Sequence, residues 1–306
     1  MERDSKIIVP ILLIGFNRPD TIDLVFNQIS KVKPLKLYVA IDGPRLGKTG
    51  EIELVEEVKK IVSNVNWPCE THYRFNNSNE GAEITVSSAI SWVFENEEFV
   101  IILEDDILAS LSFFTFAQEM LFKYENNNNI WRVTGVNYFP SIKTHFDADY
   151  FFAKWGISWG WATWKRVWNK YNLYVDIPKI HTQKYFLKTI SSNKDEMYYY
   201  KYLFSEMRNK GIGNNTWDFI ALYLRRIYGG VDIVPKKNLI SNIGEYGLHA
   251  KGNTIHHNRP IDDDFVIQKH PPKIVINIEY DKAFFNNFRK LSLKQQLIRK
   301  LKSIIK

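Results

Sequence analysis

The sequence predicts an α/β fold in which a mostly parallel sheet is flanked by helices. Over about the first hundred residues, continuous apolar runs alternate three times with segments of helical period. Parallel strands that are buried on both faces are apolar along their whole length, whereas the helices between them are apolar on one face. With 306 residues, 45% of them apolar, the chain is long enough to bury a sizeable core.

The predicted elements follow one another regularly in the first half of the chain. Strands are expected at 6–16, 35–42, 69–75 and 98–106, with helices between them at 18–32, 51–65 and 81–97. Pro19 suits the first turn of the first helix. Residues 150–171 are dense in aromatic residues and glycine, and two helices are expected at 192–211 and 214–230, followed by a short strand and loops at 231–244. The end of the chain, residues 284–306, has the pattern of a basic amphipathic helix.

Composition and charge exclude several classes of protein. Cys69 is the single cysteine, so an intramolecular disulfide and a cysteine-based zinc cluster are excluded. We expect no membrane span and no signal peptide. The single cysteine is compatible with a reducing cytoplasm, where we expect the protein to be located. The net charge is +7, and residues 283–306 carry seven Lys or Arg and no acid. The rest of the chain is balanced in charge, which argues against a nucleic-acid-binding protein.

Three adjacent carboxylates, Glu104, Asp105 and Asp106, follow the apolar run of 99–103. Burying an unpaired carboxylate is costly, so these groups need water, basic side chains or a metal ion as partners. In an extended segment Glu104 and Asp106 point to one side and Asp105 to the other. Such an acid pair suits Mg²⁺ or Mn²⁺ with substrate phosphates as further ligands. The alternative is a solvated acidic turn.

Other candidates fall at the same edge, because ligands of parallel sheets bind beyond the carboxyl ends of the strands. Asn17 and Arg18 follow the first strand and Asp42 ends the second. Arg18 could hold a phosphate or be a surface arginine, and Asp42 could accept a hydrogen bond from a base or ribose or form an Asp-Gly turn. Asp218 could be a general base or an acid favoured at a helix N-terminus.

Six segments together resemble the GT-A-type glycosyltransferases of the nucleotide-diphospho-sugar transferase superfamily, in particular bacterial relatives of N-acetylglucosaminyltransferase I. They are PILLIGFNRPD, YVAIDGPR, WVFENEEFVIILEDDILAS, SWGWATWKRVW, TWDFIALY and NLISNIGEYGLHA, and they span residues 7 to about 258. The resemblance implies a nucleotide-sugar donor, a divalent metal and inverting transfer. It implies that Asp106 is the metal ligand, supported by Glu104 and Asp105. Further implied roles are nucleotide binding by Asn17 and Arg18, uracil contact by Asp42, and catalytic base for Asp218.

The resemblance also implies a division of the chain. Residues 1–270 would form the GT-A domain, with a nucleotide-sugar-binding half at 1–136 and an aromatic-rich acceptor half at 137–270. Residues 271–306 would form a C-terminal extension with the basic helix. Trp159, Trp161 and Trp217 are candidates for binding the acceptor, and packing inside the protein is their alternative role.

We therefore expect a glycosyltransferase, using Mn²⁺ or Mg²⁺, that moves a hexosyl or N-acetylhexosaminyl group from a UDP-sugar. The acceptor would be a glycan or lipid-linked molecule in bacterial surface polysaccharide synthesis. The basic tail would hold the enzyme on anionic lipid at the inner face of the cell membrane, unless it packs on the body. Two alternatives remain, a metal-dependent phosphoesterase, which usually needs more ligands, and a non-enzymatic adaptor that binds anionic membranes.

Overall fold

The computed structural model describes residues 6–212, 214–245 and 254–290, which form two compact units. The first unit contains the described residues of 1–171 and 230–277, and the second those of 172–229 and 278–306. Each unit is built from two separate segments, so the chain passes between the units three times. The predicted boundaries after 136 and 270 follow expected roles rather than compactness, and they stay a prediction.

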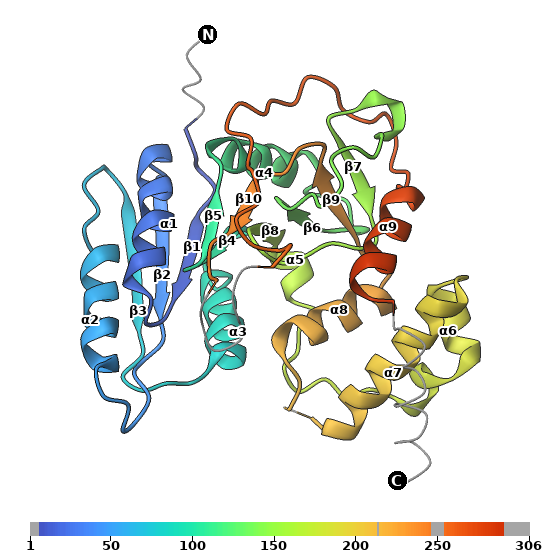
Figure 1. The fold of residues 1–306 in the computed structure, drawn as a ribbon, viewed down its shortest axis with the longest axis horizontal. Coiled ribbons are helices and arrows are strands. Elements are labelled where there is room, and N and C mark those ends of the chain that lie inside the picture. Colours follow the sequence, from blue (N-terminus) through green and yellow to red (C-terminus); the bar gives the residue numbers. More distant parts are fainter. Residues whose placement is uncertain (1–5, 213, 246–253, 291–306) are drawn as a thin grey trace. The chain divides into compact units, whose positions relative to one another are not determined.

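The first unit begins with the predicted alternation of strands and helices, which is confirmed. Strands β3, β2, β1 and β4 are neighbours in that order, and all three pairs are parallel (Figure 1). The bounds are β1 (Ile11–Gly15), α1 (Pro19–Val32), β2 (Lys36–Ile41), α2 (Glu51–Val62), β3 (Glu70–Phe75), α3 (Ala82–Val93) and β4 (Phe99–Glu104).

Helices cover both faces of this parallel region. The chain moves outward from β1 to β3 and then returns past β1 to β4. Because crossover connections are right-handed, α1 and α2 lie on one face and α3 on the other. Helices α1 and α2 pack side by side, while α3 contacts β1 and β2 (Figure 1). Strand β1 is buried at all five positions, as its continuous apolar run predicts.

The sheet continues beyond β4 with four further strands in the order β8 (Trp161–Trp164), β6 (Ile130–Thr134), β9 (Val231–Pro235) and β7 (Tyr150–Ala153). Strands β8 and β7 run antiparallel to their neighbours, so six of the eight described strands of the sheet share one direction. The fold is therefore the predicted α/β class with a mostly parallel sheet. Strands β6, β7 and β8 were not predicted, because they are short and their aromatic residues show no clear period.

Smaller elements complete the first unit. Strands β5 (Ile107–Ala109) and β10 (Ile240–Asn242) form a separate antiparallel pair. Ser110 caps α4 (Leu111–Lys123) by accepting a hydrogen bond from the Phe113 backbone N–H. The remaining elements are α5 (Lys165–Trp168) and η1 (His145–Asp147). The β5–β10 pair brings the chain after residue 242 close to the end of β4, where the candidate site lies.

The second unit is helical over its described residues, with η2 (Lys179–Thr182), α6 (Lys184–Ile190), α7 (Lys194–Lys210), α8 (Trp217–Ile227) and α9 (Ile278–Phe288). Helix α9 comes from the end of the chain and buries Tyr280, Phe284 and Phe285 almost completely. The predicted basic amphipathic helix falls mainly on 291–306, which lie outside the described residues.

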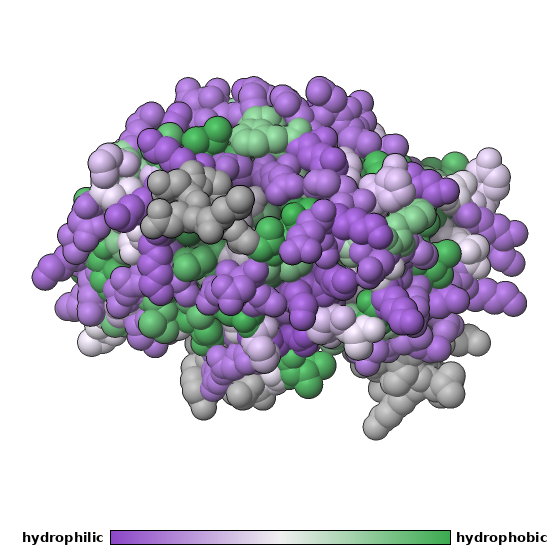
Figure 2. All heavy atoms as spheres, turned by 90° about the horizontal axis from the view of Figure 1, so that it is seen from above, coloured by the Kyte–Doolittle hydropathy of each residue, from purple (hydrophilic) through white to green (hydrophobic). Residues whose placement is uncertain are grey.

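On the face drawn in Figure 2, hydrophilic residues predominate and hydrophobic residues gather only in small groups. In the described part of the chain, no helix combines the length and the apolar character that crossing a membrane requires.

Candidate functional site

Polar side chains meet at the carboxyl edge of the sheet in the first unit, at the ends of β1, β2 and β4. These strands are direct neighbours, with Gly15 of β1 opposite Ile41 of β2 and Ile14 of β1 opposite Glu104 of β4. The segments that follow them, 16–18, 42–45 and 105–106, therefore lie beside one another. The sequence had predicted this convergence, and the structure brings Asn17, Arg18, Asp42 and the three carboxylates to this edge.

Arg18 is the partner of two of the adjacent carboxylates. Its Nη1 donates to Asp106 Oδ2 at 2.9 Å, and its Nη2 donates to Asp105 Oδ1. The backbone N–H of Phe16 donates to the second oxygen of Asp105 at 3.1 Å. Asp105 is 3% exposed, and this burial raises the pKa of its carboxyl to about 6, against the opposing effect of Arg18. A guanidinium therefore balances the charge at the end of this strand.

The three carboxylates differ in exposure. Asp105 is buried, while Glu104 and Asp106 are intermediate, with 16% of the Asp106 side chain exposed. Strand β4 ends at Glu104 and the chain turns at the next two residues, which lets Arg18 reach both aspartates. The carboxylates that face outward are the pair that the alternation predicted.

The segment after β10 closes on Asp106. The backbone N–H of Ile243 donates to the Asp106 carbonyl at 2.9 Å. A Cβ added at Gly244 would lie 2.4 Å from Asp106 Oδ2 and 2.8 Å from Arg18 Nη1. Only glycine fits this close approach without displacing the ion pair, and no local pattern around Gly244 indicates the contact.

The oxygen donors at this edge fit a hard divalent cation that takes its other ligands from water and substrate. Among the described residues, no group of three His, Cys, Asp or Glu side chains could hold a metal ion. Asp105 is buried and bound by Arg18 and Phe16, whereas Asp106, which Arg18 also binds, and Glu104 are partly exposed oxygen donors. One or two carboxylates suffice for Mg²⁺ or Mn²⁺ when substrate phosphates complete the coordination.

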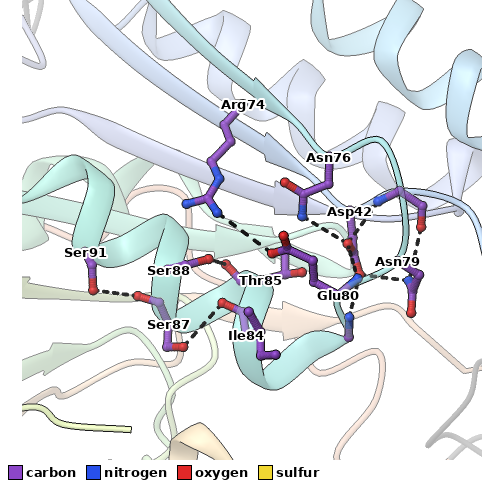
Figure 3. A network of polar contacts seen from close by, with 12 residues as sticks. Asp42, Arg74, Asn76, Asn79, Glu80, Ile84, Thr85, Ser87, Ser88 and Ser91 are labelled. Carbon is purple, nitrogen blue, oxygen red and sulfur yellow. Dashed lines mark hydrogen bonds and ion pairs between the residues drawn. The ribbon is translucent and has the colours of Figure 1, made fainter.

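Asp42 is the centre of a second network, on the other side of β1 (Figure 3). Its carboxylate is 4% exposed. Its two oxygens accept five hydrogen bonds of 2.8–3.1 Å, from the backbone N–H groups of Gly43, Glu80 and Gly81 and from the side-chain amides of Asn76 and Asn79. Asp42 thus joins the loop after β2 to the loop after β3.

The implied contact of Asp42 with uracil stays a prediction, because the five bonds already engage both carboxylate oxygens. A base could reach this carboxylate only by replacing one of its donors. Gly43 adds to the close fit, since a Cβ there would lie 2.5 Å from the backbone of Ser78. Arg74 and Glu80 flank the same loop as an ion pair at 3.8 Å (Figure 3).

Glu51 is a site residue that the sequence analysis did not identify. It is the first residue of α2 and is 4% exposed. Its carboxylate accepts from Asn17 Nδ2 at 3.0 Å, from the Arg45 backbone N–H at 2.7 Å, and from the Arg45 guanidinium. The hydrogen bonds from the Arg45 side chain lower the pKa of Glu51. Acids are common at helix starts, so the position of Glu51 in the sequence does not indicate a role in the site.

Asp218 belongs to the second unit, whereas the carboxylates at the end of β4 belong to the first. It lies in the first turn of α8, is exposed, and accepts a 2.6 Å hydrogen bond from the Thr216 hydroxyl. An exposed carboxylate at a helix start is accessible to a substrate, and it equally fits the helix-dipole interpretation. Its role as a catalytic base therefore stays a prediction.

The three candidate tryptophans differ in burial. Trp161 in β8 is 5% exposed and Trp217 in α8 is 9% exposed, which fits the packing role for both. Trp159 is intermediate in exposure, and its ring lies 6.0 Å from the ring of His256. Trp159 is thus the one of the three whose ring is partly open to a ligand.

Comparisons with known proteins give only distant likenesses. No protein family model matches the sequence, and no curated protein matches it. The structure is similar to a mannosyltransferase, PcManGT from Pyrobaculum calidifontis, solved with GDP-Man and Mn²⁺, at 10% identity and a TM-score of 0.38 over 72% of this chain and 69% of that one. It is also similar to HddC from Yersinia pseudotuberculosis, at 5% identity and a TM-score of 0.32 over 54% of this chain and 80% of that one.

Proposed function

We propose that the protein is a metal-dependent glycosyltransferase that takes a hexosyl or N-acetylhexosaminyl group from a UDP-sugar. The observation that carries the proposal is the arrangement of Arg18 and Asp106. They meet at the carboxyl edge of the sheet, at 2.9 Å, and the Arg18 side chain is partly exposed. A guanidinium beside outward-facing carboxylate oxygens offers a phosphate ligand and a cation ligand in one place. The sequence resemblance supports the same activity.

The leaving group would be a nucleoside diphosphate, whose developing charge must be offset. Arg18 has five N–H donors in a fork, and its side chain is 29% exposed, so its remaining N–H groups can donate to phosphate oxygens while Asp105 and Asp106 each accept one. Asp106, with Glu104 beside it, would hold Mn²⁺ or Mg²⁺. The bound cation would supply charge stabilisation at the diphosphate.

Asp218 would remove the proton from the acceptor hydroxyl, which then attacks the sugar opposite the diphosphate and inverts its anomeric centre. Its carboxylate is exposed, so an acceptor can reach it. The acceptor would be a glycan or a lipid-linked glycan of a bacterial surface polysaccharide, with Trp159 as a contact for its sugar rings.

We place the enzyme in the cytoplasm, peripherally on the inner face of the cell membrane through the basic tail. Because α9 extends to Phe288 and buries Phe285, a deletion that tests the tail must begin after Lys290. Removal of residues 291–306 should release the protein from vesicles containing anionic lipid, measured by co-sedimentation. Unchanged binding would show that the tail does not attach the protein to lipid.

The activity is tested first by thermal unfolding with a panel of nucleotides and nucleotide sugars, with and without Mn²⁺. A ligand at a hundred times its dissociation constant adds about 2.7 kcal/mol to the free energy of unfolding, which raises the melting temperature. We expect a metal-dependent increase with UDP compounds in the wild type and in the control Asp23→Ala, an exposed acid on α1. Asp106→Ala should lose it. A wild type that responds to no nucleotide would refute the proposal and direct attention to phosphoesterase substrates.

A further inference from the structure

Glu51 connects two loops at the carboxyl edge and has no part in the chemistry proposed above. It binds Asn17 in the loop after β1 and both the backbone and the guanidinium of Arg45 in the loop after β2. These contacts join segments that are 34 and 6 residues away from it in the sequence. A single carboxylate thereby fixes the relative position of two loops that border the proposed donor site.

The contacts of Glu51 exceed those of an ordinary acid at a helix start. Such an acid is stabilised by the helix dipole and can remain exposed. Glu53, the other acid in the first turn of α2, is exposed. Glu51 is 4% exposed, and it pairs with Arg45, whose side chain is 31% exposed. Burying a charged carboxylate is costly unless it is paired and hydrogen-bonded, so the burial of Glu51 calls for a role beyond starting the helix.

The guanidinium of Arg45 is held in place while part of its side chain stays exposed. Its guanidinium is bound by Glu51 and lies 5.6 Å from the centre of the Phe16 ring, while 31% of its side chain is exposed. Glu51 binds Nε and Nη2 of the guanidinium, which fixes its position and, within the described residues, leaves Nη1 as a donor on a partly exposed side chain. A fixed and partly exposed guanidinium is suited to donating hydrogen bonds to a ligand.

The order of strands shows which part of a donor would meet Arg45. Arg45 follows β2 and the proposed diphosphate ligands follow β1 and β4, with β1 between β2 and β4. Neighbouring strands are about 4.8 Å apart, so the ends of β2 and β4 are separated by about 10 Å. A nucleotide sugar whose diphosphate lies at β4 would extend its nucleoside over β1 and β2.

We propose that Arg45 donates hydrogen bonds to oxygen atoms of the nucleoside half of the donor, and that Glu51 is the positioning residue that holds Arg45 and Asn17 for this contact. The inference rests on the proposed function, because it assumes a nucleotide donor at this edge. It adds a binding residue and a positioning residue on the side of the site away from the carboxylates of β4.

The test compares Glu51→Gln and Arg45→Met with Glu56→Gln. Glu56 is a matched control, because it lies on the same helix and pairs with Lys59 at 2.8 Å but is exposed. Thermal unfolding first establishes a temperature at which each variant is folded. Binding of UDP, UMP and pyrophosphate, all with Mg²⁺, is then measured by titration calorimetry.

We expect Glu51→Gln and Arg45→Met to raise the Kd of UDP and UMP by the same factor, about tenfold for one lost hydrogen bond, and to leave pyrophosphate unchanged. Glu56→Gln should match the wild type for all three ligands. A general loss of structure would weaken pyrophosphate as well, so equal weakening of all three ligands overturns the inference.

The other outcomes are equally decisive. If Glu51→Gln does not fold, Arg45→Met alone decides, since it leaves Glu51 bound to Asn17 and to the backbone N–H of residue 45. A wild type that binds no nucleotide refutes the proposed function, and the inference falls with it. A wild type that binds UDP while Arg45→Met binds UDP equally well overturns the inference and leaves the proposed function standing.

Discussion

Two buried aspartates at the same edge of the sheet are stabilised in different ways. Asp42 is 4% exposed and accepts five hydrogen bonds from uncharged amide groups. Asp105 is 3% exposed and accepts one backbone N–H together with the guanidinium of Arg18. A buried carboxylate can therefore be held by several neutral dipoles or by one counter-ion, and this chain uses both solutions within four neighbouring strands.

The difference separates a fixed region from a responsive one. The donors to Asp42 belong to the protein backbone and to two asparagines. These donors are uncharged and already bound to Asp42, so we expect them not to attract a charged ligand. Arg18 also binds Asp106, whose side chain is 16% exposed, so an incoming phosphate or cation would meet charged groups directly. We expect the Asp42 network to contribute stability and the Arg18 network to contribute ligand response.

The largest expected effect is on the fixed side. Asp42→Ala removes the acceptor of five hydrogen bonds, one buried and four partly buried, and each donor left unsatisfied away from water costs about 1–3 kcal/mol. We expect the free energy of unfolding to fall by about 4 kcal/mol or more, measured by urea denaturation. Asp42→Asn should lose less, because it keeps one acceptor oxygen. A loss below about 1 kcal/mol in Asp42→Ala would remove the distinction between the two regions.

The second prediction concerns pH and the responsive side. Burial raises the pKa of Asp105 from 3.8 to about 6, so the folded protein binds this proton more tightly than the unfolded chain does. The resulting stabilisation is complete below about pH 4 and is lost as the pH rises through 6. At 1.36 kcal/mol per pH unit, it amounts to about 3 kcal/mol.

Asp105→Asn has no proton to bind at this position and isolates the effect from other carboxylates. The difference in unfolding free energy between wild type and Asp105→Asn should change by about 3 kcal/mol between pH 4 and pH 7, in favour of the wild type at pH 4. Urea unfolding at several pH values measures it. A difference that stays constant across this range would contradict the prediction.

Alanine substitutions at two glycines compare the same two regions with smaller expected losses of stability. In Gly43→Ala the new Cβ would meet the backbone of Ser78 at 2.5 Å, whereas in Gly244→Ala it would meet side-chain atoms alone, Oδ2 and Cβ of Asp106 and Nη1 of Arg18. Side-chain ends can shift and backbone cannot, so we expect a stability loss of about 3 kcal/mol for Gly43→Ala and about 1 kcal/mol for Gly244→Ala. Gly244→Ala should weaken UDP binding more than Gly43→Ala does. Thermal unfolding with and without UDP measures the stability loss and the response to UDP of each variant. Equal values for the two variants would contradict the prediction.

The smallest effect is expected for Asn79→Ala. Its side chain donates to Asp42 Oδ2 at 2.8 Å and to the Gly43 carbonyl at 3.1 Å. Four donors to Asp42 remain after the change, so the loss should be about 1 kcal/mol. Urea unfolding measures it, with Asn27→Ala, an exposed asparagine on α1, as the control. A loss as large as that of Asp42→Ala would mean that the network depends on one contact.

The region that the sequence predicted best is the one with the most regular pattern. Strands β1, β2 and β4 are continuous apolar runs, and each is followed by a polar residue at the edge where the site lies. That regularity placed Arg18, Asp42 and the three carboxylates together. Strands β6, β7 and β8 pair through contacts that are distant in the sequence, and their Trp and Phe residues leave no alternation to identify.

The hydrogen bonds and close contacts within the site could not be predicted either, because they also join residues that are distant in the sequence. The donors to Asp42 lie 34–39 residues further along, apart from its neighbour Gly43. The partners of Glu51 come from two loops, and the approach of Gly244 to Asp106 depends on the β5–β10 pair. Local sequence gives a residue's type and its element, but these contacts arise only when separate loops are folded together.

The interleaving of the two units affects how the protein is made. Helix α9 supplies Tyr280, Phe284 and Phe285 to the second unit, yet it begins 49 residues after Gly229, where the first segment of that unit ends. During synthesis the helices of 172–229 leave the ribosome before the helix that completes their core, and the sheet of the first unit likewise waits for β9. Neither unit can finish folding until most of the chain has emerged, so both cores become complete late in translation.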